Sequence, residues 1–407
     1  MKKQIMKKTV LCSLACVLTC LSSMNRLAHA HSRQDDELGS KVSAALSATW
    51  RNDGAELQES GVWQIPGALM GGEAYPVEKG TSLDDANLTI QHNSENGIYG
   101  LLQISSHDNG NEAEIHHAYA GYTFFIGDSR LNLEGGRSAA EMTPSNAEHA
   151  SNRLFSESPL ALDVLLGRQL NDEGLRARWQ WQDWILGAES WRGSAFPATP
   201  GDNGGSFNVF LHHQEQWGRS RWRTGIWWLQ ADADERLDSR YLSGHTHGSA
   251  TVTAPEVSFS GRSELVGAFL RLDHTLTSDR QWQLQAEWIQ ADVDGSLQDS
   301  THQADHIGTH RGAWVQTALR QHQHELGVRW EHLALDNTLI GAGAPSLASI
   351  ANLYNDREPT RTTFLYAWHA TDTFLIRCEW TRDNSQEDST DRFAVGLVWQ
   401  ETLWSQR

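Results

Sequence analysis

Residues 174–191 read GLRARWQWQDWILGAESW, and this stretch decides the fold. Apolar and polar side chains alternate along 174–181, which is the period of a β-strand with one apolar and one polar face. Arg176 and Arg178 lie on the polar face. After only Gln182-Asp183 the strand pattern resumes over 184–191, so the two segments predict a tight hairpin.

The same pattern recurs along the chain, and the gaps between segments are alternately short and polar or long and rich in Gly, Asp and Ser. The expected strands are 41–50, 86–92, 98–105, 114–124, 129–137, 174–181, 184–191, 207–214, 220–231, 263–273, 281–292, 311–320, 324–333, 361–369, 372–382 and 391–400. Tight turns at one end and long loops at the other are typical of a transmembrane β-barrel. We therefore predict an all-β, antiparallel barrel of about 16 strands. A soluble β-protein with buried tryptophans is the alternative.

The first thirty residues have the features of a secretory signal peptide. Four lysines lie among the first eight residues, residues 9–21 are apolar, and Ala28-His29-Ala30 is a small-x-small cleavage site. A lipoprotein signal ending at Cys20 is the alternative. We expect a signal peptide over 1–30 and one barrel domain over 31–407, which keeps only Cys378 and can form no intrachain disulfide.

Charge and hydropathy narrow the class of protein further. The net charge is −18, and removal of five basic residues with the signal takes it to about −23. Phosphate binding needs a basic footprint, so we expect no nucleic-acid partner. No segment is apolar over the 18 or more residues that a membrane-spanning helix needs. This criterion does not apply to a β-barrel, in which every second residue faces the lumen. Many of the eighteen tryptophans fall near predicted strand ends, as in the aromatic girdles of such barrels.

The arginines on the predicted strands indicate which face is the lumen. An arginine facing lipid at mid-membrane costs about 2–4 kcal/mol, so these residues are expected to point inward. The predicted inner face carries Arg130, Arg176, Arg178, Arg221, Arg223, Arg271, Arg329, Arg377 and Arg392, against Glu134, Asp273, Glu287, Glu325, Glu331 and Glu379. The acidic excess then lies mostly in the loops.

The long segment 138–173 interrupts the strand series after the fifth strand. On either side of it, the segments 117–122 (HAYAGY), 131–137 and the return through Gly167-Arg168 to Gly174-Leu175-Arg176 resemble the porin superfamily, and more closely the phosphate-selective porin family. The resemblance implies that loop 138–173 folds into the lumen and sets the constriction. It also implies assembly as a homotrimer. Two features depart from that family: only Lys41 and Lys79 remain after signal cleavage, and the chain does not end in an aromatic residue.

The predicted pore consists of this loop and the arginines that it faces. The expected pore-lining and constriction residues are Arg176, Arg178, Arg221, Arg223, Arg329, Arg377, Glu141, Glu148, Arg153 and Glu157. Arg176 and Arg178 follow directly on the return of the loop, which makes them the first candidates for the constriction. A solvated surface loop is the alternative. Opposed loop and wall charges would give weak, salt-dependent ion selectivity.

The nineteen histidines suggest a metal site as a second possibility. His302, His306 and His310 lie in a predicted external loop with His245 and His247 in another. The first three would share one face if their loop turned helical, as zinc ligands could. The adjacent pairs His116-His117 and His212-His213 lie on predicted strands, where neighbours point to opposite faces, so neither pair is expected to chelate a metal.

These features predict an outer-membrane porin of a Gram-negative bacterium, with its termini in the periplasm. Its partners would be membrane lipid and the small hydrophilic solutes or ions that diffuse passively through it. We expect no cofactor and no catalysis, because no Gly-x-Ser-x-Gly elbow is present. An outer-membrane barrel enzyme, or a zinc-type transport barrel that captures metal with its histidine-rich external loops, is the alternative function. An autotransporter or plugged receptor is disfavoured, because no passenger or plug domain is evident.

Overall fold

A computed structural model describes residues 38–57, 62–106, 113–199, 204–238, 240, 257–354 and 357–406. The expected signal peptide, and His245 and His247, lie outside these residues. Within them, no helix has the length and apolarity to cross a membrane.

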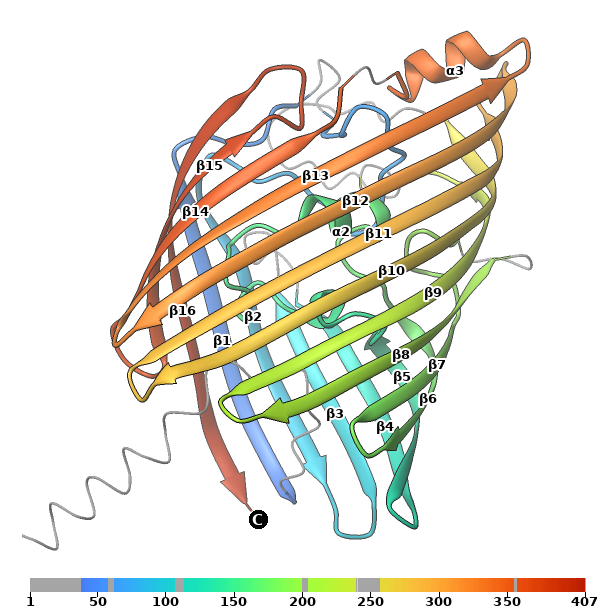
Figure 1. The fold of residues 1–407 in the computed structure, drawn as a ribbon. Helices are drawn as coiled ribbons and strands as arrows, with labels where there is room; N and C mark the ends of the chain where they lie inside the picture. The colour runs from blue at the N-terminus through green and yellow to red at the C-terminus, as the bar shows by residue number, and fades with distance from the viewer. Residues whose placement is uncertain are drawn as a thin grey trace, which may run out of the picture.

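The described chain forms a closed antiparallel barrel of sixteen strands, which confirms the predicted fold (Figure 1). The strands are β1 (Gly39–Arg51), β2 (Gly80–Asn93), β3 (Ile98–Ser106), β4 (Glu114–Ile126), β5 (Ser129–Ala139), β6 (Asn171–Trp181), β7 (Trp184–Trp191), β8 (Gly205–Trp217), β9 (Ser220–Arg236), β10 (Ser258–Thr277), β11 (Arg280–Gln298), β12 (Gln303–Gln321), β13 (His324–Ile340), β14 (Thr360–His369), β15 (Phe374–Asp383) and β16 (Thr390–Gln406). Each strand pairs with its neighbours in the sequence, and β1 pairs with β16 to close the ring.

The strands β9 to β13 are longer than the sequence predicted. They run for 17 to 20 residues, whereas a membrane-spanning strand needs about 9–11. Their extra residues lie beyond the apolar belt at the end of the barrel that carries the long loops, where the outer face turns polar, as at Asp232 and Arg262. The expected ends were placed where apolar alternation stopped, so the polar extensions were missed.

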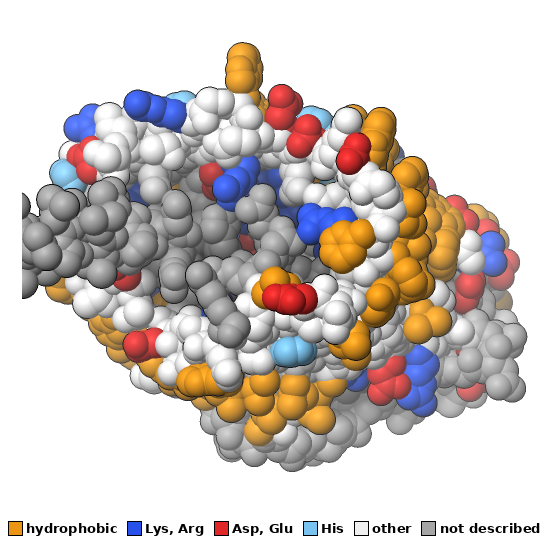
Figure 2. All heavy atoms as spheres, turned by 90° about the horizontal axis from the view of Figure 1, so that it is seen from below, with side chains coloured by type: hydrophobic (Ala, Val, Ile, Leu, Met, Phe, Trp, Pro, Cys, Tyr) orange, Lys and Arg blue, Asp and Glu red, His pale blue; other side chains and the backbone are white. Residues whose placement is uncertain are grey.

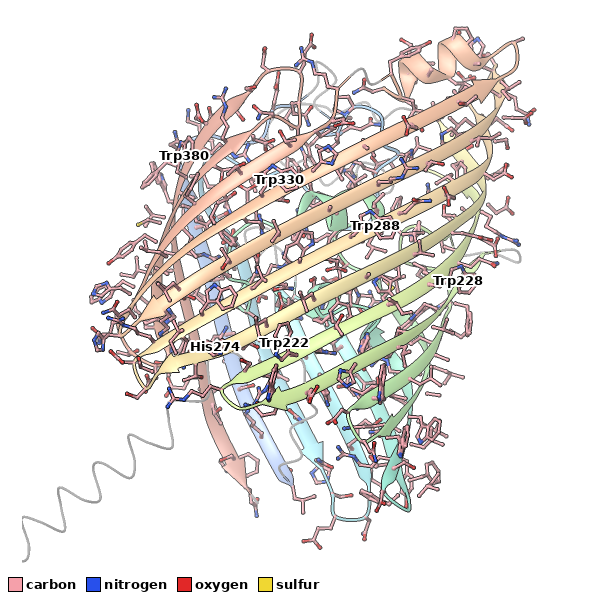
Figure 3. The ribbon with its side chains drawn as sticks, in the orientation of Figure 1. Trp222, Trp228, His274, Trp288, Trp330 and Trp380 are labelled. Atoms are coloured by element: carbon pink, nitrogen blue, oxygen red, sulfur yellow. The ribbon has the colours of Figure 1, made fainter. Side chains whose placement is uncertain are left out.

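The outer wall carries the expected belt of apolar side chains. Trp380, Trp330, Trp288 and Trp228 form a diagonal row across the outer wall, and Trp222 lies below this row, toward the tight turns (Figure 3). Indole rings on the outer wall match the aromatic girdles of a bilayer-spanning barrel. Trp191 departs from the girdle prediction, because it points inward and donates a hydrogen bond from Nε1 to Asn208 at 2.8 Å.

The inner wall is polar only in part, contrary to the expectation of a wholly polar lumen. Apolar side chains on the upper inner faces of β9 to β13 form one buried cluster with segments 63–74 and 140–170 of the loops. The second segment contains η2 (Pro144–Ala147) and then α2 (Leu160–Leu165), which packs on β11, β12 and β13. Gly312 on β12 permits this contact, because a Cβ there would lie 2.6 Å from that of Ala161. The helix α3 (Ala344–Ile350) follows β13 and lies outside, on the rim of the barrel (Figure 1).

The position of the apolar belt can be tested with one pair of substitutions on β9. Ile226 faces outward between Trp222 and Trp228, whereas Gln230 has the same orientation beyond the belt. Ile226→Arg should destabilise the barrel by about 2–4 kcal/mol and Gln230→Arg by about 0–1 kcal/mol. Urea titration of folding into lipid vesicles measures both values, and an equal cost for the two variants would place the belt elsewhere.

Candidate functional site in the barrel lumen

The loop between β5 and β6 crosses the lumen and is fixed to the opposite wall. The strands β13 to β15, which receive it, lie about half of the ring away from β5 and β6. The backbone N–H of Ser156 donates to Glu379 on β15 at 2.8 Å, and that of Leu160 donates to Glu331 on β13 at 2.6 Å. This inward course confirms the fold predicted for segment 138–173.

Glu157 is the centre of an ion network at the far end of this loop. Its carboxylate pairs with Arg361 at 2.8 Å and Arg392 at 3.0 Å, and its carbonyl oxygen accepts a hydrogen bond from Arg329 at 2.9 Å. Burial alone would raise the pKa of Glu157, but the surrounding guanidinium groups outweigh it and lower that pKa to about 2. Glu157 therefore stays ionised, and it joins three separate strands to the loop.

A second network holds the start of the loop to the near wall. Arg176 lies between Glu134, at 2.8 Å, and Glu189, and also donates to the carbonyl oxygen of Ala139. Glu141 pairs with Arg178 at 3.0 Å. Burial would raise the pKa of Glu141, but Arg178 and Arg176 lower it to about 2. Glu141 is therefore ionised at neutral pH and holds the start of the loop to Arg178.

The loop separates two cavities. The lower one, of about 690 Å³, opens toward the end of the barrel that carries the tight turns, and we call it the vestibule. Figure 2 shows this mouth from below, hollowed and lined by charged and polar side chains, with hydrophobic side chains around the outside. The upper one, of about 80 Å³, lies against loop residues 75–78 and is called the outer cavity. Arg153 lines both cavities, so this residue of the loop lies where they come closest.

The structure separates the predicted pore residues into two groups. Arg178, Arg221, Arg223, Glu141 and Glu148 line the vestibule, Glu157 lines the outer cavity, and Arg153 lines both. Arg176, Arg329 and Arg377 are buried and do not occur among the described residues lining either cavity. They face inward as predicted, but the loop covers this part of the wall, so an inner-face position did not make them pore-lining.

The predicted histidine triad is wrong. His306 and His310 lie on β12, not in a loop, and both contact Oδ1 of Asn337, at 2.9 and 3.0 Å. His302 precedes the strand and pairs with Asp299 at 2.9 Å. His306 and His310 thus reach the same oxygen, but His302 is held by Asp299 a further four residues back, about 13 Å along an extended chain, so the three rings do not meet as a triad.

The prediction for His116 and His117 is also wrong, because a β-bulge interrupts the alternation. Gln103 on β3 pairs with His117 and Ile104 pairs with Ile115, which leaves His116 as the extra residue. Both histidines therefore point inward, where they meet His149 of the loop. Among the described residues, these three form the one group of metal-ligating side chains close enough to share an ion. The sequence contained a sign of this β-bulge, because Ile115 is out of phase with the alternating apolar residues that follow it on the strand.

Comparisons with known proteins identify relatives by structure alone. No protein-family model matches the chain, and no curated protein matches its sequence. Among solved structures, a loop-deletion mutant of OmpT, an outer membrane protein of Vibrio cholerae, has a TM-score of 0.54 at 10% identity and covers 89% of this chain and 99% of its own. The fold is that of an outer-membrane porin.

Two further structures support the same fold assignment. The outer membrane channel DcaP of Acinetobacter baumannii has a TM-score of 0.52 at 9% identity, with 89% of this chain and 98% of that chain covered. Salmonella typhi OmpF, solved with daunomycin, has a TM-score of 0.52 at 10% identity, with coverage of 89% and 97%. At these identities the likeness concerns the barrel fold, and all three proteins are described as outer-membrane proteins or share that barrel. These structures do not confirm the predicted resemblance to the phosphate-selective porin family.

The network around Glu157 gives a testable dependence of stability on pH. Because its folded pKa lies below its ordinary value of 4.5, its contribution is complete above that pH and is lost as pH falls toward 2. Glu157→Gln should cost about 3 kcal/mol at neutral pH, the lower end for a broken buried pair, since Glu331 and Asp383 still hold the two arginines. Thermal unfolding from pH 7 to pH 2 should show the wild type and variant converging in acid.

Glu264→Gln is the control for this measurement, because Glu264 is exposed on the outer face of β10. This variant should follow the wild type throughout the range. A constant difference between the Glu157 variant and the wild type at every pH would contradict the ion-network explanation.

Proposed function

We propose that this chain forms an outer-membrane channel for the passive diffusion of small hydrophilic solutes, with a weak preference for those that carry a negative charge. The observation that carries this proposal is Arg153, the basic residue at which the vestibule and the outer cavity meet. A solute moving between the two cavities would pass its guanidinium. The channel would need no cofactor and no energy source.

The charge balance of the two cavities supports a preference for anions. The vestibule is lined by Arg178, Arg219, Arg221, Arg223, Arg271 and Arg320, against Glu141, Glu148, Asp273, Asp279, Glu325 and Asp372. Several of these acids are neutralised: Glu141 by Arg178, Glu148 by Arg271, and Glu325 by His369 at 2.8 Å when that imidazole is protonated. With the Arg178 and Arg271 pairs set aside and Arg153 counted, the arginines exceed the carboxylates by one, which favours anions only weakly. The groups that remain are Arg153, Arg219, Arg221, Arg223 and Arg320, against Asp273, Asp279, Glu325 and Asp372.

Arg153 and Arg223 form no ion pair with a carboxylate in the described part of the chain. Arg223 instead lies over the ring of Phe269, with its Cζ 6.0 Å from the ring centroid. Burial lowers the pKa of Arg153 to about 10, so it stays charged at neutral pH. These two arginines therefore replace Arg176 as our candidates for the residues that select the solute, because Arg176 is held between two carboxylates in the wall.

The dimensions of the cavities support small solutes. The vestibule, at about 690 Å³, is within the range of ordinary ligand pockets, about 300–1,000 Å³. The outer cavity, at about 80 Å³, accommodates only a few water molecules. Passage of anything larger than an inorganic ion would require Arg153 or the loop beside it to move, as gates in other pores do.

An enzymatic function finds less support than transport. DcaP of Acinetobacter baumannii, which shares the fold, is an outer membrane channel. Within the described residues, Ser129 of the Gly127-Asp128-Ser129 turn donates its hydroxyl to the carbonyl oxygen of Ile126 at 2.7 Å, as turn residues do. We accordingly propose that the barrel carries out no catalysis.

Export and assembly complete the proposal. Residues 1–30 would act as a signal peptide and be removed, which leaves the mature barrel with both termini in the periplasm. Assembly as a homotrimer is proposed by analogy, since one related structure is described as the trimer form of OmpT. The wall from β2 to β7, whose strands are shorter than β9 to β13, would supply the contact between copies.

Substitution of Arg153 tests the route and the charge preference together. A unit charge about 4 Å from a passing ion is worth about 1 kcal/mol in water, which is about a fivefold change in a permeability ratio. Arg153→Ala should lower the anion-to-cation permeability ratio by up to this amount and raise single-channel conductance. Reversal potentials in planar bilayers under a KCl gradient measure the first quantity, and the effect should shrink as salt rises.

Arg262→Ala provides the matched control, because Arg262 pairs with Asp232 on the outer surface, away from the lumen. It should leave both quantities unchanged. Unaltered selectivity in the Arg153 variant would show that ions take another path, and the absence of any conductance from folded wild-type protein would reject the channel proposal itself.

A further inference from the structure

Three buried imidazoles meet at the inner wall beside the crossing loop. His116 and His117 come from the bulge of β4, and His149 comes from the loop; their exposed fractions are 2%, 6% and 3%. One ligating nitrogen of each lies within 4.8 Å of the other two. The ring centroids of His116 and His149 are 4.4 Å apart, and those of His117 and His149 are 5.5 Å apart.

The geometry of the cluster is close to that of a tetrahedral metal site. Zinc binds imidazole nitrogen at about 2.0–2.1 Å, so two ligands on a tetrahedron lie about 3.3–3.4 Å apart. The Nε2 atoms of His117 and His149 are separated by 3.4 Å. No pair of the three ligand atoms is more than 4.8 Å apart, so binding would draw the rings together by about 1.5 Å at most.

The surroundings of the cluster supply the groups that orient metal ligands. Nε2 of His116 lies 2.8 Å from Oε1 of Gln169, and Nδ2 of Asn171 donates to the carbonyl oxygen of His116 at 3.0 Å. If Nε2 donates to Gln169, the lone pair of His116 lies on Nδ1, where it can bind a metal. A histidine ligand that donates its second N–H to an oxygen acceptor is the usual arrangement at metal sites.

Two polar side-chain oxygens near the cluster have no hydrogen-bond partner in the described structure. They are Oδ1 of Asn171 and Oε1 of Gln103, whose residue pairs with His117 on the neighbouring strand. Buried polar atoms are normally satisfied, so unsatisfied ones call for a bound group. A metal-bound water in the fourth position would donate hydrogen bonds to such acceptors, which is a second observation that points to the same ligand.

We propose that His116, His117 and His149 bind one divalent transition-metal ion, with Zn²⁺ as the first choice, completed by a water molecule. Three neutral nitrogen donors suit borderline metals of this kind and are poor ligands for Ca²⁺ or Mg²⁺, which prefer oxygen. The neighbours of His149 line the two cavities, Glu148 the vestibule and Ala150 the outer cavity, so an ion would enter from the lumen when this part of the loop moves.

The consequence of metal binding would be a fixed position for the loop. His149 starts the turn in which the backbone N–H of Arg153 donates to the carbonyl oxygen of His149 at 3.1 Å. A metal ion on His149 would therefore hold this turn, and Arg153 with it, against β4. The metal site is a separate proposal from the channel, since it depends on three side chains and not on conduction.

Metal binding can be measured directly on the purified barrel. Full-length mature protein, prepared in detergent without a polyhistidine tag, is dialysed against Zn²⁺ and then against metal-free buffer, and bound zinc is counted by mass spectrometry. We expect one zinc per chain in the wild type and less than one tenth of that in His149→Asn and in His117→Gln. Co²⁺ should give the intense visible absorption of a tetrahedral site in the wild type alone.

Two further variants separate this site from general histidine binding. His306→Asn combined with His310→Asn removes two buried histidines outside the cluster and should retain one zinc per chain. Gln169→Ala should weaken zinc binding by about 10–100-fold, as expected for a residue that orients a ligand. Heat-modifiable migration on gels confirms that each variant is folded.

Either of two results would overturn the metal site. One is folded wild-type protein that retains no zinc and gives no tetrahedral Co²⁺ spectrum. The other is zinc retained at the wild-type level in both ligand variants, which would place the ion elsewhere. Because the counts require no conductance, they distinguish failure of this proposal from failure of the channel.

Discussion

Closure of the sheet between β1 and β16 is the constraint on which the rest of the structure depends. These strands pair from Ser40↔Gln406 to Arg51↔Ala394, so the sheet has no free edge. In a bilayer, every backbone N–H and C=O must be paired within the protein, and a closed barrel is the only sheet that achieves this. Closure also fixes the outside as apolar and leaves an interior that is wide enough for a further chain segment.

The crossing loop makes this interior a defined site. Its apolar side chains pack with inner-wall residues such as Leu229 and Leu333, and its polar ones join buried ion pairs on both sides. Buried ion pairs add little stability compared with well-packed apolar groups, but breaking one is costly, because an unpaired charge remains. The networks at Glu157 and Arg176 therefore act mainly to determine where the loop lies.

The same loop carries the groups that remain available for function. Most lumen carboxylates near it are paired with an arginine, whereas Arg153, at the junction of the two cavities, is not among those pairs. Four residues earlier, His149 reaches the two histidines of the β4 bulge. A bulge bends and re-aims side chains on a strand, and here it turns an alternating pair of histidines into a convergent one. The positions of Arg153 and of the histidine cluster in the lumen thus depend on the bulge in β4 and on the turn of the loop that contains His149.

The sequence by itself determined the barrel, its sixteen strands and the lumen-facing arginines, because these follow from local alternation and from the lengths of gaps. The inward course of loop 138–173 was predicted only from the resemblance to porins. Only the tertiary structure decided which arginines are exposed to the lumen and which histidines converge. Arg361 meets Glu157 across 204 residues of sequence, and His149 meets His117 across 32. Contacts of this kind arise from ring closure and loop docking, which leave no periodic trace in the chain. The run Ile226-Trp227-Trp228-Leu229 was the exception, since apolar side chains on both faces of a strand are the mark of a wall covered from inside.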